Sequence, residues 1–295
     1  MTQDLYPVDD ILADVEALMH DSIRGSESLL SAATEACLYH LKTGGKRNRA
    51  RLAIHCGQAL NLTKSSQVAA AAVAELLHNA SLIHDDLQDH DDTRRGNETV
   101  WKKYGADVAL CAGDIMISAS YAALLHADCR GLLPQCVTLI HRSVCKSIQG
   151  QCHDLSYTRY ESYTLLDYEK MAEGKSGPLL SLPVELVYQM SGHQSQIEQV
   201  REAVYKFAVA YQITDDINDV DQDLRRGETG AAAPNAVIVL RDNGHGEKSD
   251  SVASLRVFTL LDEVKRDIST LPGQLSEIFN TYILGLRASL SEDKA

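Results

Sequence analysis

The sequence predicts an all-α fold, and three observations lead to this. Alanine and leucine are abundant while only 6 of the 295 residues are proline, a composition that favours helices. In successive segments, apolar residues recur at the three- and four-residue spacing of one helix face. The hydrophobic share of 44% is large enough for a sizeable core, although aromatic residues contribute only 5%.

The expected helices follow one another along the whole chain. In the first, Ile11, Val15, Leu18 and Met19 share one face. The second ends at Thr43-Gly44-Gly45, a glycine pattern typical of a helix C-terminus. The Gly177-Pro178 pair predicts a helix break. The predicted helices cover residues 8–22, 26–42, 65–89, 104–126, 135–155, 197–221, 251–270 and 273–290, with a polar loop over 242–250.

Composition excludes several classes of function. A net charge of −13 argues against nucleic acid or an anionic membrane as a general partner, so any phosphate site must be a local basic cluster. The 7 cysteines contain no Cys-x-x-Cys pair, which fits reduced thiols in the cytosol. We expect no signal peptide in the acidic first 22 residues and no stable membrane anchor, since no stretch reaches about 18 uncharged apolar residues. The prediction is a soluble, cytoplasmic protein.

An aspartate-rich segment ends the long apolar helix predicted over 65–89. Asp85 and Asp89 are four residues apart, so their carboxylates share one helix face, with Asp86 beside them. Like charges this close favour a bound hard cation such as Mg²⁺. Arg94 and Arg95 follow directly, and arginine makes forked contacts to phosphate. Together these residues predict a site for metal and diphosphate.

A second segment repeats this spacing 130 residues later. Asp215, Asp216 and Asp219 also follow a mostly apolar stretch. One such segment can be simply a solvated acidic helix end, but two matching copies make that interpretation weak. An EF-hand is excluded because its central glycine and final glutamate are out of register.

A basic cluster precedes both acidic motifs. Lys46, Arg47 and Arg49 are three cations within four residues, directly after Gly44-Gly45. At the start of a helix, cations oppose the helix dipole unless an anion binds there. The cluster therefore predicts an anion at this helix N-terminus.

At these motifs the chain resembles the trans-type isoprenyl diphosphate synthases, also called polyprenyl synthetases. The resemblance covers roughly residues 30–230 and includes Gly44-Gly45-Lys46 with Arg49, both aspartate motifs, Gln151 with Asp154, and Lys175-Ser176-Gly177. It implies the isoprenoid synthase fold, a bundle of ten or more helices around a deep central cavity. It also implies one domain over residues 1–295 and a homodimer.

The resemblance also implies roles for individual residues. Isopentenyl diphosphate would be bound by Lys46, Arg49, His78 and Arg95. The allylic diphosphate would be bound by Arg94, Lys175, the hydroxyl of Ser176, and Gln212. About three Mg²⁺ ions per active site would be held by Asp85, Asp89, Asp215, Asp216 and Asp219. The catalytic residues would be Asp85, Asp86, Asp89, Arg94, Lys175 and Asp215.

The chain departs from the family pattern in three places. Ala50 replaces a proline, and Glu98 and Trp101 replace a proline and a histidine, so we expect altered local packing. The lysines usual after the second motif are absent; Arg225 and Arg226 stand in that region, before a tract at 231–234 that resembles a flexible lid.

The implied reaction is a head-to-tail prenyl transfer that depends on Mg²⁺. Ala80 and Ser81 are small where shorter-product enzymes carry an aromatic ring, so we expect geranylgeranyl diphosphate, with 20 carbons. Products of 15 carbons, or of 25 and more, stay open. Three alternatives are a class I terpene cyclase, a catalytically silent partner subunit, and a metal-binding helical bundle without prenyl chemistry.

Overall fold

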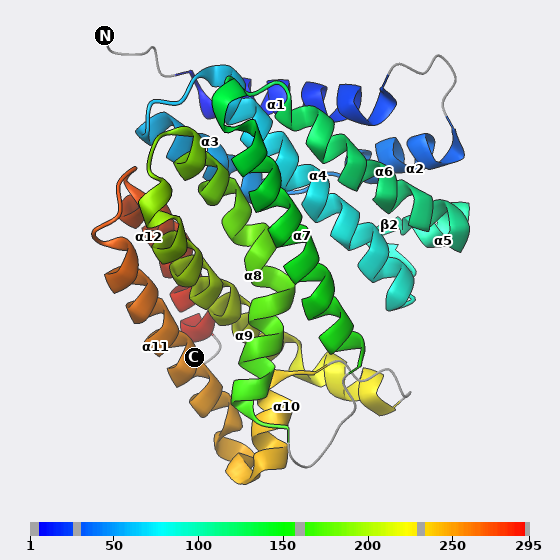
Figure 1. The fold of residues 1–295 in the computed structure, drawn as a ribbon. Helices are drawn as coiled ribbons and strands as arrows, with labels where there is room; N and C mark the ends of the chain where they lie inside the picture. The colour runs from blue at the N-terminus through cyan, green and yellow to red at the C-terminus, as the bar shows by residue number, and fades with distance from the viewer. Residues whose placement is uncertain (1–5, 26–30, 157–162, 229–233, 293–295) are drawn as a thin grey trace. The chain divides into compact units, whose positions relative to one another are not determined.

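A computed structural model describes residues 6–25, 31–156, 163–228 and 234–292. Over these residues it has twelve α-helices and one two-stranded hairpin, so the prediction of an all-α fold is confirmed (Figure 1). The chain divides into two compact units. Residues 1–138 and 186–193 form the first unit, and residues 139–185 and 194–295 form the second. The expectation of one domain stays a prediction.

The first unit is built around α4 (Lys64–Gln88), which packs against α3 (Asn48–Ala59) and α6 (Ala106–Leu124). The Thr63 hydroxyl accepts the amide hydrogen of Ser66 and starts α4. Nearly every residue from Ser66 to Leu77 is buried, as the apolar sequence predicts. In α1 (Val8–Arg24), the predicted face of Ile11, Val15, Leu18 and Met19 is buried.

Two further helices complete this unit, α2 (Ala32–Lys42) and α5 (Val100–Tyr104). The Ser31 hydroxyl caps α2 by accepting the amide hydrogen of Thr34. The helix predicted over 104–126 is found as α6 over Ala106–Leu124, and Gly105, whose φ of 89° suits glycine, separates it from α5. Helix α6 is long and apolar enough to cross a membrane, but its partly buried surface is also that of a core helix.

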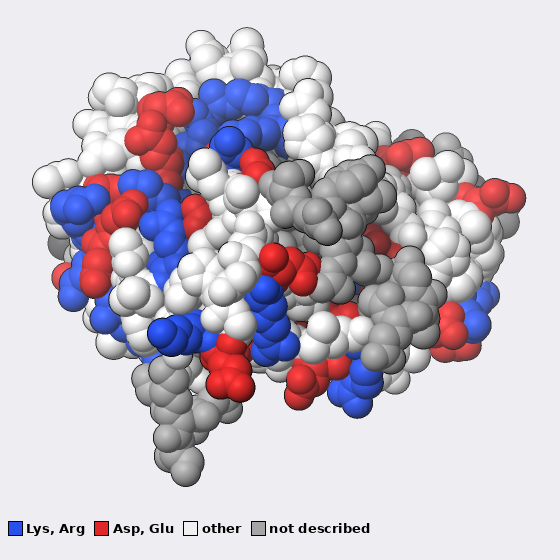
Figure 2. Space-filling view, turned by 90° about the horizontal axis from the view of Figure 1, so that it is seen from below, with Lys and Arg blue, Asp and Glu red and all other residues white. Residues whose placement is uncertain are grey.

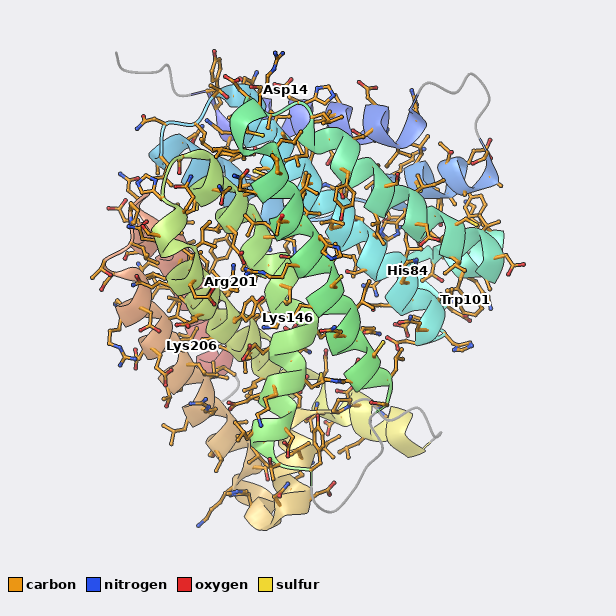
Figure 3. The ribbon with its side chains drawn as sticks, in the orientation of Figure 1. Asp14, His84, Trp101, Lys146, Arg201 and Lys206 are labelled. Carbon is orange, nitrogen blue, oxygen red and sulfur yellow. The ribbon has the colours of Figure 1, made fainter. Side chains whose placement is uncertain are left out.

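Gly113 of α6 makes room for a side chain of α4. An added Cβ at Gly113 would lie 2.0 Å from Nε2 of His84. The imidazole of His84, labelled in Figure 3, therefore fits only because position 113 carries no side chain.

The second unit contains most of α7 (Leu133–Leu155) and α8 (Leu165–Met190), followed by α9 (Ile197–Glu228) and three further helices. These are α10 (Ala236–Leu240), α11 (Ser249–Ile268) and α12 (Leu275–Glu292). Helix α11 runs along α9, as Figure 1 shows. The prediction of a polar loop over residues 242–250 is wrong. Helical turns occupy Arg241–His245 and Gly246–Lys248, and α11 begins at Ser249.

The helix break predicted at Gly177-Pro178 is wrong. Helix α8 continues through both Pro178 and Pro183. A proline inside a helix removes one amide donor, which leaves carbonyls of the preceding turn in need of partners. The Ser147 hydroxyl of α7 donates to the Lys175 carbonyl at 3.1 Å, and this neighbouring helix thereby supports the altered turn.

Gly150 of α7 lies directly on the same turn of α8. An added Cβ there would come within 2.2 Å of the Gly174 carbonyl carbon. The two helix backbones are therefore in contact at the turn that carries Lys175.

Candidate diphosphate and metal site

The first aspartate motif lies at the C-terminal end of α4. Asp86 is buried, Asp85 is half-buried and Asp89, the residue that ends the helix, is exposed. Asp85 and Asp89 are one helical turn apart, so the accessible face carries this pair. The middle residue, Asp86, points into the protein.

Arg94 makes an ion pair with Asp86 through two nitrogens that share one carboxylate oxygen. Its Nε and one terminal nitrogen each lie 2.6 Å from Oδ1 of Asp86. Burial raises the pKa of the Asp86 carboxyl, and the Arg94 charge opposes that shift. Arg94, which the sequence assigns to an allylic diphosphate, is thus already engaged by a carboxylate of the first motif.

A β-hairpin directs the two adjacent arginines to different partners. Strand β1 (Thr93–Arg94) pairs with β2 (Asn97–Glu98), and Arg94 lies opposite Asn97. The two turn residues, Arg95 and Gly96, have φ values of 53° and 76°, which is the pattern of a type I′ turn. The sequence analysis missed this hairpin; the Arg-Gly pair at its centre was the available signal.

Arg95 reaches the glycine-rich loop before α3. One of its terminal nitrogens donates to the Gly44 carbonyl, and an added Cβ at Gly45 would lie 2.9 Å from the same nitrogen. Gly45 has a φ of 152°, at the edge of the range that favours glycine. The absence of a side chain at Gly45 lets the guanidinium of Arg95 lie against the loop.

The residues predicted to hold isopentenyl diphosphate come together in the first unit. Lys46 is exposed beside Gly45, and Arg49 is half-buried in the first turn of α3. Burial lowers the pKa of His78 well below its usual value, and the charges of Arg49 and Arg95 add to that effect. His78 is therefore neutral at pH 7, and it adds an uncharged donor or acceptor to a site whose other predicted residues are cations.

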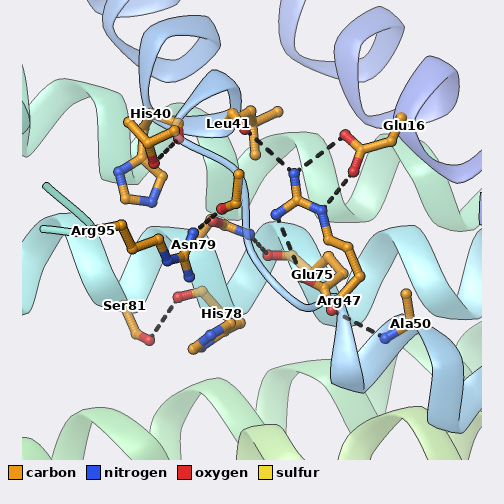
Figure 4. Close-up of polar contacts among 12 residues, drawn as sticks. Glu16, His40, Leu41, Arg47, Ala50, Glu75, His78, Asn79, Ser81 and Arg95 are labelled. Atoms are coloured by element: carbon orange, nitrogen blue, oxygen red, sulfur yellow. Dashed lines mark hydrogen bonds and ion pairs between the residues drawn. The ribbon is translucent and has the colours of Figure 1, made fainter. Parts of the chain in front are cut away.

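Arg47 and Glu75 were not among the predicted site residues. Arg47 pairs with Glu16 of α1 (Nε to Oε1, 2.5 Å), and Glu75 accepts the amide hydrogen of Ala50 at 3.0 Å (Figure 4). The basic cluster predicts an anion at the start of α3. The protein itself supplies part of this negative charge, as the buried carboxylate of Glu75. Ala50, which replaces the family's proline, has the amide hydrogen that this bond requires.

The second motif repeats the division between accessible and buried carboxylates. Asp219 is exposed and Asp215 half-buried, while Asp216 is 5% exposed. Asp216 Oδ2 accepts the amide hydrogen of Ala236 at 2.7 Å, and Oδ1 accepts from Gln212 at 3.3 Å. The Asp216 carboxylate therefore holds α10 to α9, and its metal-binding role stays a prediction.

Burial and charge repulsion raise carboxyl pKa values in this motif. The pKa of Asp215 is raised to about 7, chiefly by burial and then by the charges of Asp216 and Asp219. The pKa of Asp216 is raised to about 6 by burial, against the effect of its hydrogen bonds. A nearby cation would relieve this repulsion.

The residues predicted to bind the allylic diphosphate in the second unit are Lys175, Ser176 and Gln212. Lys175 Nζ donates to Oδ2 of Asp154, so α7 supplies a counter-charge to this lysine. Ser176 is half-buried on the next position of α8, and Gln212 is the residue that donates to Asp216. The predicted lid at 231–234 lies almost wholly outside the described residues.

Trp101 has a packing role. Its indole nitrogen donates to the Asp91 carbonyl at 2.8 Å, and the Thr99 hydroxyl donates to the same carbonyl at 2.7 Å. The ring also packs edge-on against His90, with centroids 5.7 Å apart. These bonds fix the segment between α4 and the hairpin.

The donor set of both motifs fits a hard cation. All donors are carboxylate oxygens, and Oδ2 of Asp86 is buried without a hydrogen-bond partner among the described residues. Within that part of the chain, no three His, Cys, Asp or Glu side chains converge on one metal position. Mg²⁺ commonly binds through one or two carboxylates and takes its other ligands from water and substrate phosphate.

A model of the polyprenyl synthetase family matches residues 31–230, more than half of the chain. The chain belongs to the polyprenyl synthetase family. The two aspartate motifs, the basic loop and Lys175 all lie within the matched residues. This polyprenyl synthetase is accordingly a trans-prenyltransferase.

Known members of the family share both sequence and fold with this chain. A geranylgeranyl pyrophosphate synthase of Geoglobus acetivorans is 26% identical, over 90% of this chain and 85% of its own. A chloroplastic geranylgeranyl pyrophosphate synthase of Capsicum annuum is 32% identical, over 70% and 57%. A solved geranylgeranyl pyrophosphate synthetase from Geoglobus acetivorans has a TM-score of 0.80 at 22% identity, covering 98% of both chains, which supports the isoprenoid synthase fold.

Proposed function

We propose that this polyprenyl synthetase condenses isopentenyl diphosphate with an allylic diphosphate to give geranylgeranyl diphosphate. The observation that carries the proposal is the basic site of the first unit, where Lys46 and Arg49 lie at the start of α3 and Arg95 donates to the Gly44 carbonyl of the same loop. Several relatives, including those of Geoglobus acetivorans and Capsicum annuum, carry the geranylgeranyl name, and they support the 20-carbon product.

The chemistry follows from the charges. The carbon–oxygen bond of the allylic diphosphate breaks, and its electron pair leaves with pyrophosphate. The double bond of isopentenyl diphosphate attacks the resulting cation, and a proton is then lost to the released pyrophosphate. Lys46, Arg49 and Arg95 would hold the diphosphate of the attacking molecule, and neutral His78 would orient it without adding charge.

We assign the metal ligands to the accessible carboxylates. Asp85 and Asp89 of the first motif and Asp215 and Asp219 of the second would hold Mg²⁺. When bound, Mg²⁺ would neutralise charge on the departing pyrophosphate. Asp86 and Asp216 would orient their motifs through Arg94 and through the amide of Ala236.

The inner surface of α4 supports a product longer than 15 carbons. One turn before Asp85 stand Ala80, which is 2% exposed, and Ser81, whose hydroxyl donates to the His78 carbonyl at 2.9 Å. Neither side chain fills space as an aromatic ring would. On the same face of this helix, Leu77 is the next residue toward the N-terminus, and it is larger.

We also propose a homodimer formed through α6. This helix exposes apolar side chains, with Leu110 53% and Leu125 at its end 68% exposed. Elsewhere charges of both signs are interspersed on the surface, as Figure 2 shows for one face. A second copy covering α6 would remove these leucines from water. Sedimentation should give twice the monomer mass, and Leu110→Glu should return the protein to a monomer.

A cytoplasmic location is part of the proposal. The exposed thiols of Cys111 and Cys152 are free, as expected in a reducing compartment. Fractionation of cells that express the tagged chain would test it, and recovery from the membrane fraction would contradict it.

A product assay tests the proposed reaction. Purified protein, Mg²⁺, isopentenyl diphosphate and dimethylallyl, geranyl or farnesyl diphosphate would be incubated, and the products sized by mass spectrometry. A 20-carbon diphosphate is expected, and EDTA should abolish its formation. A product of 15 or of 25 and more carbons would keep the reaction and change the length. No condensation by the folded protein would favour a catalytically silent subunit.

A further inference from the structure

Glu75 is a buried carboxylate in the wall of the basic site. It lies on α4, is 2% exposed, and is neither a predicted ligand nor part of an aspartate motif. Its Oε1 accepts the amide hydrogen of Ala50 at 3.0 Å (Figure 4). Ala50 is the third residue of α3, where amide hydrogens have no acceptor inside the helix. Glu75 therefore caps the helix that carries Arg49.

The other oxygen of Glu75 faces Arg47. Arg47 NH1 lies 3.9 Å from Oε2 of Glu75, while its Nε pairs with Glu16 and NH2 donates to the Leu41 carbonyl at 3.3 Å. Side chains or backbone of three helices, α1, α2 and α4, thus meet at the guanidinium of the residue that precedes α3. Arg47 has a φ of 50°, an unfavourable value for a side chain other than glycine, and these contacts offset that cost.

The charge of Glu75 also acts on Arg95. It raises the pKa of Arg95, which burial and the charges of Arg47 and Arg94 lower. Without a negative group inside this cluster, the cations before and within the first turn of α3 would repel one another and oppose the helix dipole. Glu75 supplies that negative group without occupying the accessible side of the loop, where Lys46 is exposed.

We propose that Glu75 is a positioning residue for the isopentenyl diphosphate site, which it organises by capping α3 and balancing Arg47 and Arg95. The proposal rests on the proposed function, since it takes isopentenyl diphosphate as the ligand of Lys46, Arg49 and Arg95. Glu75 itself would not touch the substrate, because a carboxylate repels a diphosphate.

Two substitutions separate the two effects of the carboxylate. Glu75→Gln keeps an oxygen that can accept from Ala50 but removes the charge. Ala50→Pro keeps the charge but removes the amide donor, and a proline is tolerated in the first turn of a helix. Glu185→Gln is the matched control, because Glu185 is also buried and pairs with an arginine, Arg201 at 2.6 Å, in the second unit.

The measurement is the Kd for isopentenyl diphosphate by calorimetry in EDTA, together with kcat and both KM values in Mg²⁺. Each variant at the site should weaken isopentenyl diphosphate binding about fivefold or more, the factor expected for loss of one hydrogen bond or charge contact. The KM for the allylic diphosphate should change less than twofold. Glu185→Gln should lower stability and leave the Kd unchanged.

The two possible roles of Glu75 give opposite results. A carboxylate that only lies nearby would weaken anion binding, so Glu75→Gln would then bind isopentenyl diphosphate more tightly. Tighter or unchanged binding in Glu75→Gln, or unchanged binding in Ala50→Pro, would overturn the proposal, and Ala50→Pro decides alone if Glu75→Gln does not fold. Wild-type protein that binds but does not condense would contradict only the proposed function; wild-type protein that does not bind would contradict both.

Discussion

The guanidinium of Arg94 lies 2.6 Å from Oδ1 of Asp86, the buried middle residue of the first aspartate motif. Asp216, the middle residue of the second motif, likewise accepts a hydrogen bond at 2.7 Å, from the amide of Ala236. In both motifs the middle carboxylate is bound by the protein, and its neighbours at i−1 and i+3 are left on the accessible face. This division leads to the first two predictions.

Replacing Asp86 should lower the stability of the protein as well as its prenyltransferase activity. Asp86→Ala removes the partner of the part-buried Arg94, so we expect the free energy of unfolding to fall by about 1–3 kcal/mol. Urea denaturation measures the change. Asp92→Ala, which breaks the exposed pair with Lys102 at 3.1 Å, is the control and should change stability by less than about 1 kcal/mol. If the two substitutions lowered the free energy of unfolding equally, the buried pair of Asp86 and Arg94 would have no greater structural role than an exposed pair.

Asp85→Ala should separate activity from stability. Asp85 is half-buried on the accessible face, so its loss should leave the fold intact while kcat falls by about 10²-fold or more, as when a charge-stabilising group is removed. Turnover with isopentenyl and farnesyl diphosphates, together with the unfolding temperature, tests this. Near-normal turnover would contradict the metal assignment.

Ala80→Phe should shorten the product. Ala80 is buried one turn before Asp85, and an aromatic ring there would fill the space beyond a shorter prenyl chain. Mass spectrometry of the products should show 15 carbons or fewer in place of 20. Ala288→Phe adds the same ring at an exposed position of α12 and should leave the product unchanged. An unchanged product from Ala80→Phe would assign the length limit to another helix.

His40 should make stability depend on pH. It is 3% exposed, and burial, followed by the charges of Arg95 and Arg94, lowers its pKa to about 4. The unfolded chain takes up this proton near pH 6.5 and the folded protein does not. The free energy of unfolding should therefore fall as the pH decreases from about 6.5 to 4, by up to about 3 kcal/mol. In His40→Gln this part of the pH dependence should disappear. If the free energy of unfolding fell equally steeply with pH in both proteins, the role of His40 would be contradicted.

Gly150→Ala should disturb the turn that carries Lys175. The added methyl group would lie 2.2 Å from the Gly174 carbonyl carbon, so α7 and α8 must separate. We expect a loss of about 1–3 kcal/mol in the free energy of unfolding and a higher KM for the allylic diphosphate. Gly285→Ala is the control, since no heavy atom lies within 4 Å of its added Cβ. That substitution should be neutral or stabilising.

The sequence predicts periodic features of this protein well and features set by tertiary contact poorly. The helix that ends at the first motif, predicted over 65–89, is found at 64–88, because its apolar pattern and its burial agree. The continuation of α8 past Pro178 could not be predicted, since it is supported by Ser147 on another helix. For the same reason, periodicity marks Glu75 only as a polar residue on a buried helix; its partner Ala50 is 25 residues away.

The candidate site shows the same difference. Spacing alone predicts that Asp85 and Asp89 share a face, and motif order predicts Lys46, Arg49, His78 and Arg95. The inward orientation of Asp216 depends on α10, a short helix that the sequence analysis missed. Metal binding, the product length and the roles of single residues remain predictions for the experiments above.

The type I′ turn at Arg95-Gly96 has a consequence for inserting or deleting residues. With two residues between the paired strands, Arg94 points to Asp86 and Arg95 to the Gly44 carbonyl. A strand that slips by one residue turns every side chain to the opposite face. A single inserted residue before Arg94 that shifts β1 by one position would therefore move Arg94 into the turn position of Arg95, and its ion pair with Asp86 would be lost while both arginines stay in the sequence. In this segment the length of the chain matters as much as its composition.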